Sequence, residues 1–196
     1  MSVKKVHVSW QHIEKQVQEL IRQLLLDQWI PDYVVGITRG GLVPANMLSQ
    51  YLNCRMETLQ VRLRDGVADE TCESNLWMSE EAFGFVSPED RATVNCRWDP
   101  SLRKKILIVD DINDSGATLN WIKNDWQRSC LPDEDAWNTV WGNNVRVAVL
   151  YDNEASDCKL DINYSAVSIN KFERPEWIVF PWEEWWRRWN LNEEHK

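Results

Sequence analysis

Residues 106–119, ILIVDDINDSGATL, decide the fold of this chain. The stretch begins with four aliphatic residues, Ile106 to Val109, a pattern typical of a strand buried on both faces in a parallel sheet. Two adjacent carboxylates, Asp110 and Asp111, follow it, and a short polar turn then leads into a helix that we expect to begin near Thr118. Parallel sheets bind ligands at the carboxyl ends of their strands, so we expect a functional site here.

The residue types at this strand end suit a sugar phosphate. One carboxylate of the pair Asp110 and Asp111 can accept hydrogen bonds from vicinal ribose hydroxyls while its neighbour faces a divalent cation, and oxygen ligands suit magnesium. Gly116 lets the backbone approach a ligand closely. Backbone amides and two hydroxyls at a helix start can converge on one phosphate, and here they belong to Asp114, Ser115, Gly116, Ala117 and Thr118.

The acidic pair has two other interpretations. An ILIVDD strand end also opens response-regulator receiver domains, but there the strand starts the domain, whereas here it begins at residue 106 of 196. The other alternative is a strand followed by an ordinary Asp-rich turn. Two acidic residues alone would favour that turn, but the fourteen-residue pattern is more specific.

The rest of the chain alternates strand and helix patterns. An amphipathic helix is expected behind Ser9, a plausible N-cap, and a second helix over residues 42–52. Strands are expected at residues 33–37, 56–63, 106–109 and 145–151, and a helix from near Thr118 to about Arg128. This alternation predicts an α/β fold with a mostly parallel sheet, in one domain spanning residues 1–196.

Composition limits the class of protein. The formal net charge is −9 and the isoelectric point is near 4.9, which argues against nonspecific binding to nucleic acid or to an anionic membrane. The five cysteines have no CxxC spacing, so neither a disulfide framework nor a zinc site is indicated. No apolar stretch approaches membrane-spanning length and the N-terminus is polar, so we expect a cytoplasmic protein.

Two further segments carry functional patterns. The loop Thr38-Arg39-Gly40-Gly41 follows the first buried strand, and its paired glycines and fixed positive charge suit a pyrophosphate. A GG pair alone would be better explained as a structural turn. Near the C-terminus, residues 175–182 read PEWIVFPW, an aromatic and aliphatic run between two prolines.

Together these segments resemble the type I phosphoribosyltransferases. ILIVDDINDSGATL resembles their signature for phosphoribosyl diphosphate (PRPP), in the form typical of 6-oxopurine enzymes, and VGITRGGLVPA resembles the pyrophosphate loop of the bacterial xanthine-guanine and hypoxanthine enzymes. PEWIVFPW resembles the base-binding hood of the same family. The resemblance implies a mostly parallel sheet flanked by helices, with a small C-terminal hood.

The resemblance also implies a reaction and a set of roles. A purine nitrogen displaces pyrophosphate from PRPP with Mg²⁺ as cofactor, and the relatives are usually homodimers or homotetramers. Asp110 and Asp111 hold the ribose hydroxyls, Asp111 also holding the metal, and Asp114 is the general base. The other implied contacts are residues 114–118 for the 5′-phosphate, Arg39, Gly40 and Gly41 for pyrophosphate, with a cis peptide at Arg39-Gly40, and Trp177 and Ile178 for the base.

One departure concerns the identity of the base. In 6-oxopurine enzymes, a lysine follows the strand that corresponds to residues 145–151 and donates to the six-position oxygen, but this chain continues Asp152-Asn153-Glu154. Asn153 is the best-aligned substitute and Asp152 the next, and neither is positively charged. A transferase for another base therefore stays open, as does a nonenzymatic regulator that senses PRPP or nucleotides on the same fold.

Two segments have no clear pattern of their own. The polar stretch from about Arg64 to Arg103 corresponds to a mobile loop that closes over the site in phosphoribosyltransferases, with a short helix expected around residues 79–83. The core is expected to span about residues 1–170, and the hood and a Trp-rich helix about residues 171–196. The helical spacing of four tryptophans predicts packing and not ligand binding for Trp182, Trp185, Trp186 and Trp189.

Overall fold

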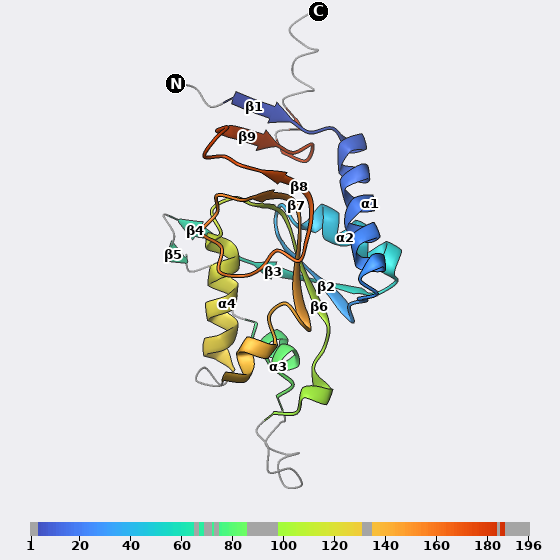
Figure 1. Cartoon of the computed structure of the whole chain (residues 1–196), viewed down its shortest axis with the longest axis vertical. Coiled ribbons are helices and arrows are strands. Elements are labelled where there is room, and N and C mark those ends of the chain that lie inside the picture. The colour runs from blue at the N-terminus through green and yellow to red at the C-terminus, as the bar shows by residue number, and fades with distance from the viewer. Residues whose placement is uncertain are drawn as a thin grey trace, which may run out of the picture.

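A five-stranded parallel sheet forms the centre of the molecule in a computed structural model (Figure 1). The structure describes residues 4–64, 67–68, 72, 75–85, 98–130, 135–183 and 185–186. The strand order is β3-β2-β6-β7-β8. The strands are β2 (Tyr33–Thr38), β3 (Arg55–Gln60), β6 (Ile106–Asn113), β7 (Val145–Asn153) and β8 (Tyr164–Ile169).

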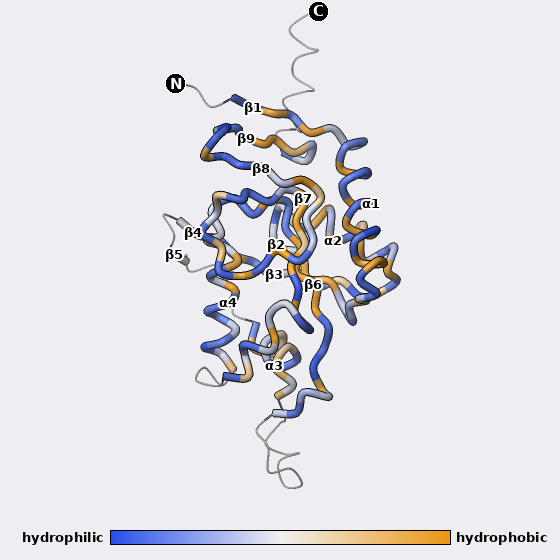
Figure 2. The backbone as a smooth tube through the Cα atoms, viewed as in Figure 1, coloured by the Kyte–Doolittle hydropathy of each residue, from blue (hydrophilic) through white to orange (hydrophobic). Residues whose placement is uncertain are grey.

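Helices cover both faces of this sheet. Helices α1 (Trp10–Leu26) and α2 (Leu42–Leu52) pack on one face, to the right in Figure 1, and α3 (Leu76–Phe83) and α4 (Ala117–Ser129) pack on the other. The hydrophobic residues concentrate along the central strands and the inner sides of the helices (Figure 2). The described helices all fall short of the length and apolar character that a membrane span requires.

The central strand β6 supplies side chains to both hydrophobic cores. Ile106 and Ile108 pack under α3 and α4, whereas Leu107 and Val109 pack under α1 and α2, and all four are fully buried. Alternate side chains of a strand point to opposite faces, so an unbroken aliphatic run is what a strand between two helical layers requires. The α/β fold expected from the sequence is confirmed.

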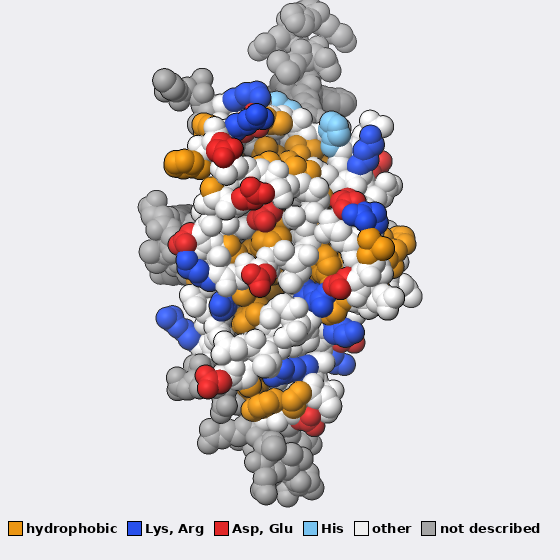
Figure 3. Space-filling view, viewed as in Figure 1, with side chains coloured by type: hydrophobic (Ala, Val, Ile, Leu, Met, Phe, Trp, Pro, Cys, Tyr) orange, Lys and Arg blue, Asp and Glu red, His pale blue; other side chains and the backbone are white. Residues whose placement is uncertain are grey.

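Smaller elements lie around this centre. Strands β1 (Lys4–His7) and β9 (Glu176–Val179) form a separate parallel pair above the main sheet in Figure 1. Strands β4 (Leu63–Arg64) and β5 (Val67–Ala68) form an antiparallel pair, and the described residues include the 3₁₀ helices η2 (Pro100–Leu102) and η3 (Asp135–Thr139). Acidic and basic side chains of the described residues are interspersed on the face in Figure 3, so negative charge is not gathered in one patch there.

The expected elements differ from the structure mainly at strand ends. The strand expected at residues 56–63 ends at Gln60, because its partner β2 ends at Thr38, opposite Gln60. The strand expected at 106–109 continues to Asn113 because it stays paired with β7 after it leaves β2. The helix behind Ser9 is confirmed, and the Ser9 side chain accepts a hydrogen bond from the His12 backbone N–H.

The two segments without a clear pattern are described in part. In the stretch 64–103, α3 contains the short helix expected at residues 79–83, and residues 65–66, 69–71, 73–74 and 86–97 lie outside the described residues. The Trp-rich segment forms turns at residues 181–182 and 185–186, and Trp189 lies outside the described residues. The described part of that segment is therefore not the expected helix.

Leu107→Ala is expected to lower the free energy of unfolding by about 2–5 kcal/mol, because it leaves a cavity under a side chain with no exposed surface. The same substitution at Leu26, which is 71% exposed at the end of α1, is expected to change it by less than about 0.5 kcal/mol. Urea unfolding of both variants measures the difference, and equal losses would contradict the assignment of β6 to the core.

Candidate active site

The site lies where two neighbouring strands of the sheet part. Strands β2 and β6 are paired up to Gly36 and Val109. Beyond this point β2 stays with β3, and β6 continues beside β7 to Asn113. The chain moves outward in both directions from this pair of strands, which makes it the switch point at which open α/β sheets bind ligands. Asp110 and Asp111 lie there.

Residues 110–119 line one cavity of about 240 Å³. Gly116 caps the N-terminus of α4 with a φ of 82°, and the Ala117 N–H donates to Ser115 Oγ at 3.4 Å. The first amides of a helix have no partner within the helix and carry partial positive charge. The contiguous residues predicted to bind a phosphate are therefore brought together, and the cavity suits an anion.

A neighbouring loop fixes the shape of the cavity lined by residues 110–119, which we call the cradle. The Asp157 N–H donates to the Ser115 carbonyl at 3.2 Å, and Asn120 Nδ2 donates to the Asp157 carbonyl at 2.9 Å. A side chain at Gly116 would collide with the backbone of Cys158, in addition to the strain of its positive φ. The loop and the cradle therefore fit only if residue 116 has no side chain.

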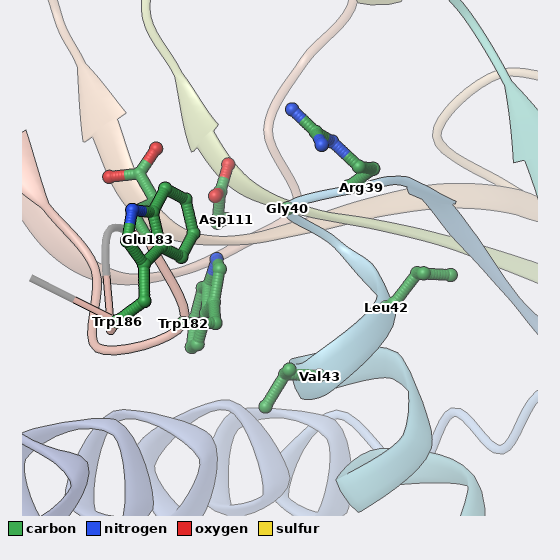
Figure 4. A pocket seen from close by; sticks show the side chains of 8 residues that line it. All are labelled: Arg39, Gly40, Leu42, Val43, Asp111, Trp182, Glu183 and Trp186. Carbon is green, nitrogen blue, oxygen red and sulfur yellow. The ribbon is translucent and has the colours of Figure 1, made fainter. Parts of the chain in front are cut away.

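A second, larger cavity of about 550 Å³ lies on the other side of Asp111. Gly40 has no side chain, and any Cβ there would collide with the Asp111 carboxylate. The cis peptide is Thr38-Arg39, one bond before the position expected from the sequence. The lining residues are Arg39, Gly40, Leu42, Val43, Asp111, Trp182, Glu183 and Trp186 (Figure 4).

Trp182 and Glu183 are site residues that the sequence analysis missed. Trp182 stacks on Phe180, with ring centroids 4.9 Å apart and planes 7° apart, and also contacts Trp10. Figure 4 shows its indole nitrogen directed toward Asp111. Trp182 packs as expected, and both Trp182 and Trp186 also line the cavity. Nothing in the sequence indicates that Trp182 approaches Asp111.

The carboxylates of Asp110, Asp111 and Glu183 form an acidic crevice between the two cavities, in which neighbouring charges repel one another. Burial, reinforced by the charge of Asp111, raises the pKa of Asp110 well above its ordinary value. Burial and then the charge of Glu183 raise the pKa of Asp111 to about 6. In Figure 4 the Asp111 and Glu183 carboxylates lie beside each other. A cation bound between the substrate and these groups would relieve this repulsion.

Magnesium fits this set of donors. The described residues contain no cluster of three or more potential metal-ligating side chains. Mg²⁺ is commonly held by one or two carboxylates together with substrate phosphates, and Asp111 and Glu183 supply two carboxylates beside the larger cavity.

An ion pair marks the far side of the cradle. Lys171, from the turn after β8, places Nζ 2.8 Å from Asp114 Oδ2, and its side chain is only 18% exposed. Asn153, at the end of β7, donates from Nδ2 to the Asp114 carbonyl at 2.8 Å. Its Oδ1 accepts from the backbone N–H groups of Ala155 and Lys171 at 3.3 and 3.0 Å. Asn153 is therefore buried and makes these hydrogen bonds within the protein, and its contact with the base stays a prediction.

The other residues expected to bind the base are more dispersed. Asp152 accepts a hydrogen bond from Asn113 Nδ2 at 2.8 Å. Trp177 lies in β9 opposite Lys5 of β1 and is 56% exposed, whereas Ile178 is buried. Neither Trp177 nor Ile178 lines the two cavities beside Asp111.

A model of the phosphoribosyl transferase domain matches residues 8–188. The chain belongs to this family. Among curated proteins, the chain is 28% identical to the xanthine-guanine phosphoribosyltransferase of Cereibacter sphaeroides over 186 residues, with 92% of this chain and 87% of that protein covered. It is 18% identical to xanthine phosphoribosyltransferase 1 of Saccharomyces cerevisiae over 190 residues, with 91% and 90% covered.

A solved structure has the same fold. The purine phosphoribosyltransferase of Pyrococcus horikoshii is similar with a TM-score of 0.60 and 23% identity, with 92% of this chain and 95% of that chain covered. At this identity the similarity concerns the fold alone. The sequence-based assignment to the phosphoribosyltransferases is confirmed by the family match.

In this phosphoribosyltransferase, Gly116→Ala is expected to weaken binding of 5′-phosphorylated ligands at least tenfold and to lower stability by about 2 kcal/mol or more, because of strain and a collision. Gly142→Ala is the matched control, because Gly142 also has a positive φ, 78°, but a Cβ there meets nothing closer than 3.9 Å. Calorimetry with ribose 5-phosphate and urea unfolding separate the two variants. Equal losses would show that strain alone matters.

Asp111→Asn is expected to stabilise the metal-free phosphoribosyltransferase at pH 8 by roughly 1–3 kcal/mol. The raised pKa of Asp111, about 6, means that the unfolded chain releases this proton at lower pH than the folded chain. The negative charge of Asp111 therefore lowers the free energy of unfolding. This loss grows from about pH 4 to pH 6 and stays constant above pH 6. The gain should accordingly shrink as pH falls from 6 to 4.

Urea unfolding at several pH values, with exposed Asp161→Asn as the control, measures this effect. A gain that is the same at pH 4.5 and pH 8 would contradict the raised pKa.

Proposed function

We propose that this protein transfers the 5-phosphoribosyl group from PRPP to a 6-oxopurine base, xanthine, guanine or hypoxanthine, in purine salvage. The products are a nucleoside 5′-monophosphate and pyrophosphate. The observation that carries the proposal is the pair of cavities beside Asp110 and Asp111. One is formed by a helix N-terminus and suits the 5′-phosphate, and the other contains Arg39 and suits the pyrophosphate.

The carboxylates between the cavities fit the sugar. Asp110 and Asp111 would accept hydrogen bonds from the two ribose hydroxyls, and the ribose would then bridge the two anion sites. Residues 114–118 would hold the 5′-phosphate, and Arg39, Gly40 and Gly41 would hold the pyrophosphate. Fixing both ends of PRPP leaves the anomeric carbon between them and open to attack, and positioning of this kind contributes much of the rate in such reactions.

Mg²⁺ is the cofactor that these donors suit. Asp111, with Glu183 beside it, would hold the ion together with oxygens of the substrate. When bound, it neutralises the negative charge of the leaving pyrophosphate.

Asp114 is the proposed general base. Its side chain is 51% exposed at the edge of the phosphate cradle, so its carboxylate can reach a base placed over the sugar. There it would accept the proton of the purine's imidazole ring as the new glycosidic bond forms.

The hood residues complete the proposed base site. The exposed indole of Trp177 on β9 offers a surface on which a purine can stack, and Ile178 would contribute its backbone. Asp152 is a further candidate for the base edge. The names of the relatives, xanthine-guanine and xanthine phosphoribosyltransferase, favour a 6-oxopurine over other bases.

The proposal extends to assembly and location. We expect a homodimer or homotetramer, which light scattering would test. The four cysteines in the described part of the chain are free, which favours a reducing compartment such as the cytoplasm.

Purified protein with PRPP and Mg²⁺ is expected to consume guanine, hypoxanthine or xanthine, followed as release of pyrophosphate. Asp114→Asn is expected to lower kcat about 10²- to 10⁴-fold, the usual contribution of a general base, while PRPP affinity stays within about threefold. Asp135→Asn, at the exposed start of η3, is the control that should behave as the parent protein.

Different results would redirect the assignment. Turnover of adenine or a pyrimidine alone would refute the 6-oxopurine substrate. Tight binding of PRPP without turnover of any base would instead favour a nonenzymatic regulator. Unchanged kcat in Asp114→Asn would remove Asp114 as the base.

A further inference from the structure

We propose that Lys171, in the turn after β8, donates to the six-position oxygen of the base and sets the preference for oxopurines. This inference rests on the proposed function and deepens it. The end of β7 offers Asp152 and Asn153, and neither carries a positive charge. The turn after the adjacent strand, β8, supplies the charge instead.

The first support is the ion pair with Asp114. The Lys171 ammonium lies 2.8 Å from Asp114 Oδ2, and its side chain is mostly buried, so the charge is held in place and is not free in solvent. An ammonium has three N–H donors and the carboxylate takes one. The remaining donors lie next to the proposed general base, where a bound purine would be.

The second support is the way the backbone of Lys171 is fixed. Asn153 binds the Asp114 carbonyl through Nδ2 and the Lys171 N–H through Oδ1, so one buried amide sets the spacing of the two residues. The turn beyond is also fixed, because Asn170 Oδ1 accepts from the N–H groups of Phe172 and Glu173 at 3.1 and 3.2 Å. Hydrogen bonds therefore fix the backbone of Lys171 itself and that of the two residues that follow it.

The paired charges match one edge of an oxopurine. The six-position oxygen is an acceptor, and the adjacent imidazole nitrogen carries the proton that a base removes. A carboxylate and an ammonium side by side complement this edge. Adenine presents an amino group at the same place, which an ammonium cannot bind because both groups are donors. The pair therefore discriminates between oxo and amino purines by repulsion as well as attraction.

The test compares ligands with and without the oxygen. Lys171→Met is measured by calorimetry with guanosine 5′-monophosphate and with 2-aminopurine ribonucleoside 5′-monophosphate, which lacks the six-position oxygen and the proton on N1. The variant is expected to lose roughly 10- to 100-fold in affinity for the guanine nucleotide, the range for a hydrogen bond to a charged group, and less than threefold for the other nucleotide.

The control is Lys123→Met. Lys123 is also partly buried, and its ammonium donates to the Lys159 carbonyl away from Asp114. This variant should bind both nucleotides as the parent does. Unchanged PRPP affinity in Lys171→Met shows that the site is intact, and Lys171→Arg should keep part of the preference for the guanine nucleotide.

Equal losses for both nucleotides would overturn the inference, because Lys171 would then act only by positioning Asp114. No loss for either would overturn it as well. If either outcome is found and the parent protein turns over an oxopurine, the role of Lys171 is refuted but the proposed function is not. A parent that turns over no base refutes the proposed function itself.

Discussion

The site depends on the four residues by which β6 continues past the last pair that it shares with β2. The strand is anchored by aliphatic side chains buried in both cores, and it then carries Asp110 and Asp111 past the last pair that it shares with β2. Burial of two adjacent carboxylates is unfavourable, as their raised pKa values show. The cores on either side of β6 offset this cost and hold the acids at an open edge where substrate groups can reach them.

A single amide organises the other side of the site. Asn153 ties the ends of β6, β7 and β8 together through its contacts with the backbones of Asp114, Ala155 and Lys171. This task needs a donor and an acceptor on one short side chain, which an amide has and an ammonium does not. A lysine at position 153 could not accept the Lys171 N–H. The amide of Asn153 thus explains why the end of β7 has no positive charge, and it also holds Lys171 beside Asp114.

The sequence predicted the parts of the molecule that are local in the chain. Aliphatic runs and helical spacing predicted the layers, and the cradle was predictable because residues 110–119 are contiguous. The length of β3 depends on where β2 ends and that of β6 on its pairing with β7, and the periodicity of the sequence contains neither. The contacts of Lys171 with Asp114 and of Trp182 with the cavity join distant segments. No spacing rule relates such segments, so these residues could be found only from the structure.

The distribution of charge in the crevice makes sense for the proposed transition state. Arg39 and Lys171 lie on opposite sides of the carboxylates, one in the larger cavity and one beside Asp114. PRPP is highly anionic, so an acidic crevice is poorly suited to binding PRPP in its ground state. As pyrophosphate leaves, however, positive charge develops on the sugar between these carboxylates. Groups fixed in advance around a developing charge stabilise the transition state more than the ground state, and this difference is what accelerates a reaction. In the proposed reaction, the acids that repel one another in the free protein would therefore interact most favourably at the moment of transfer.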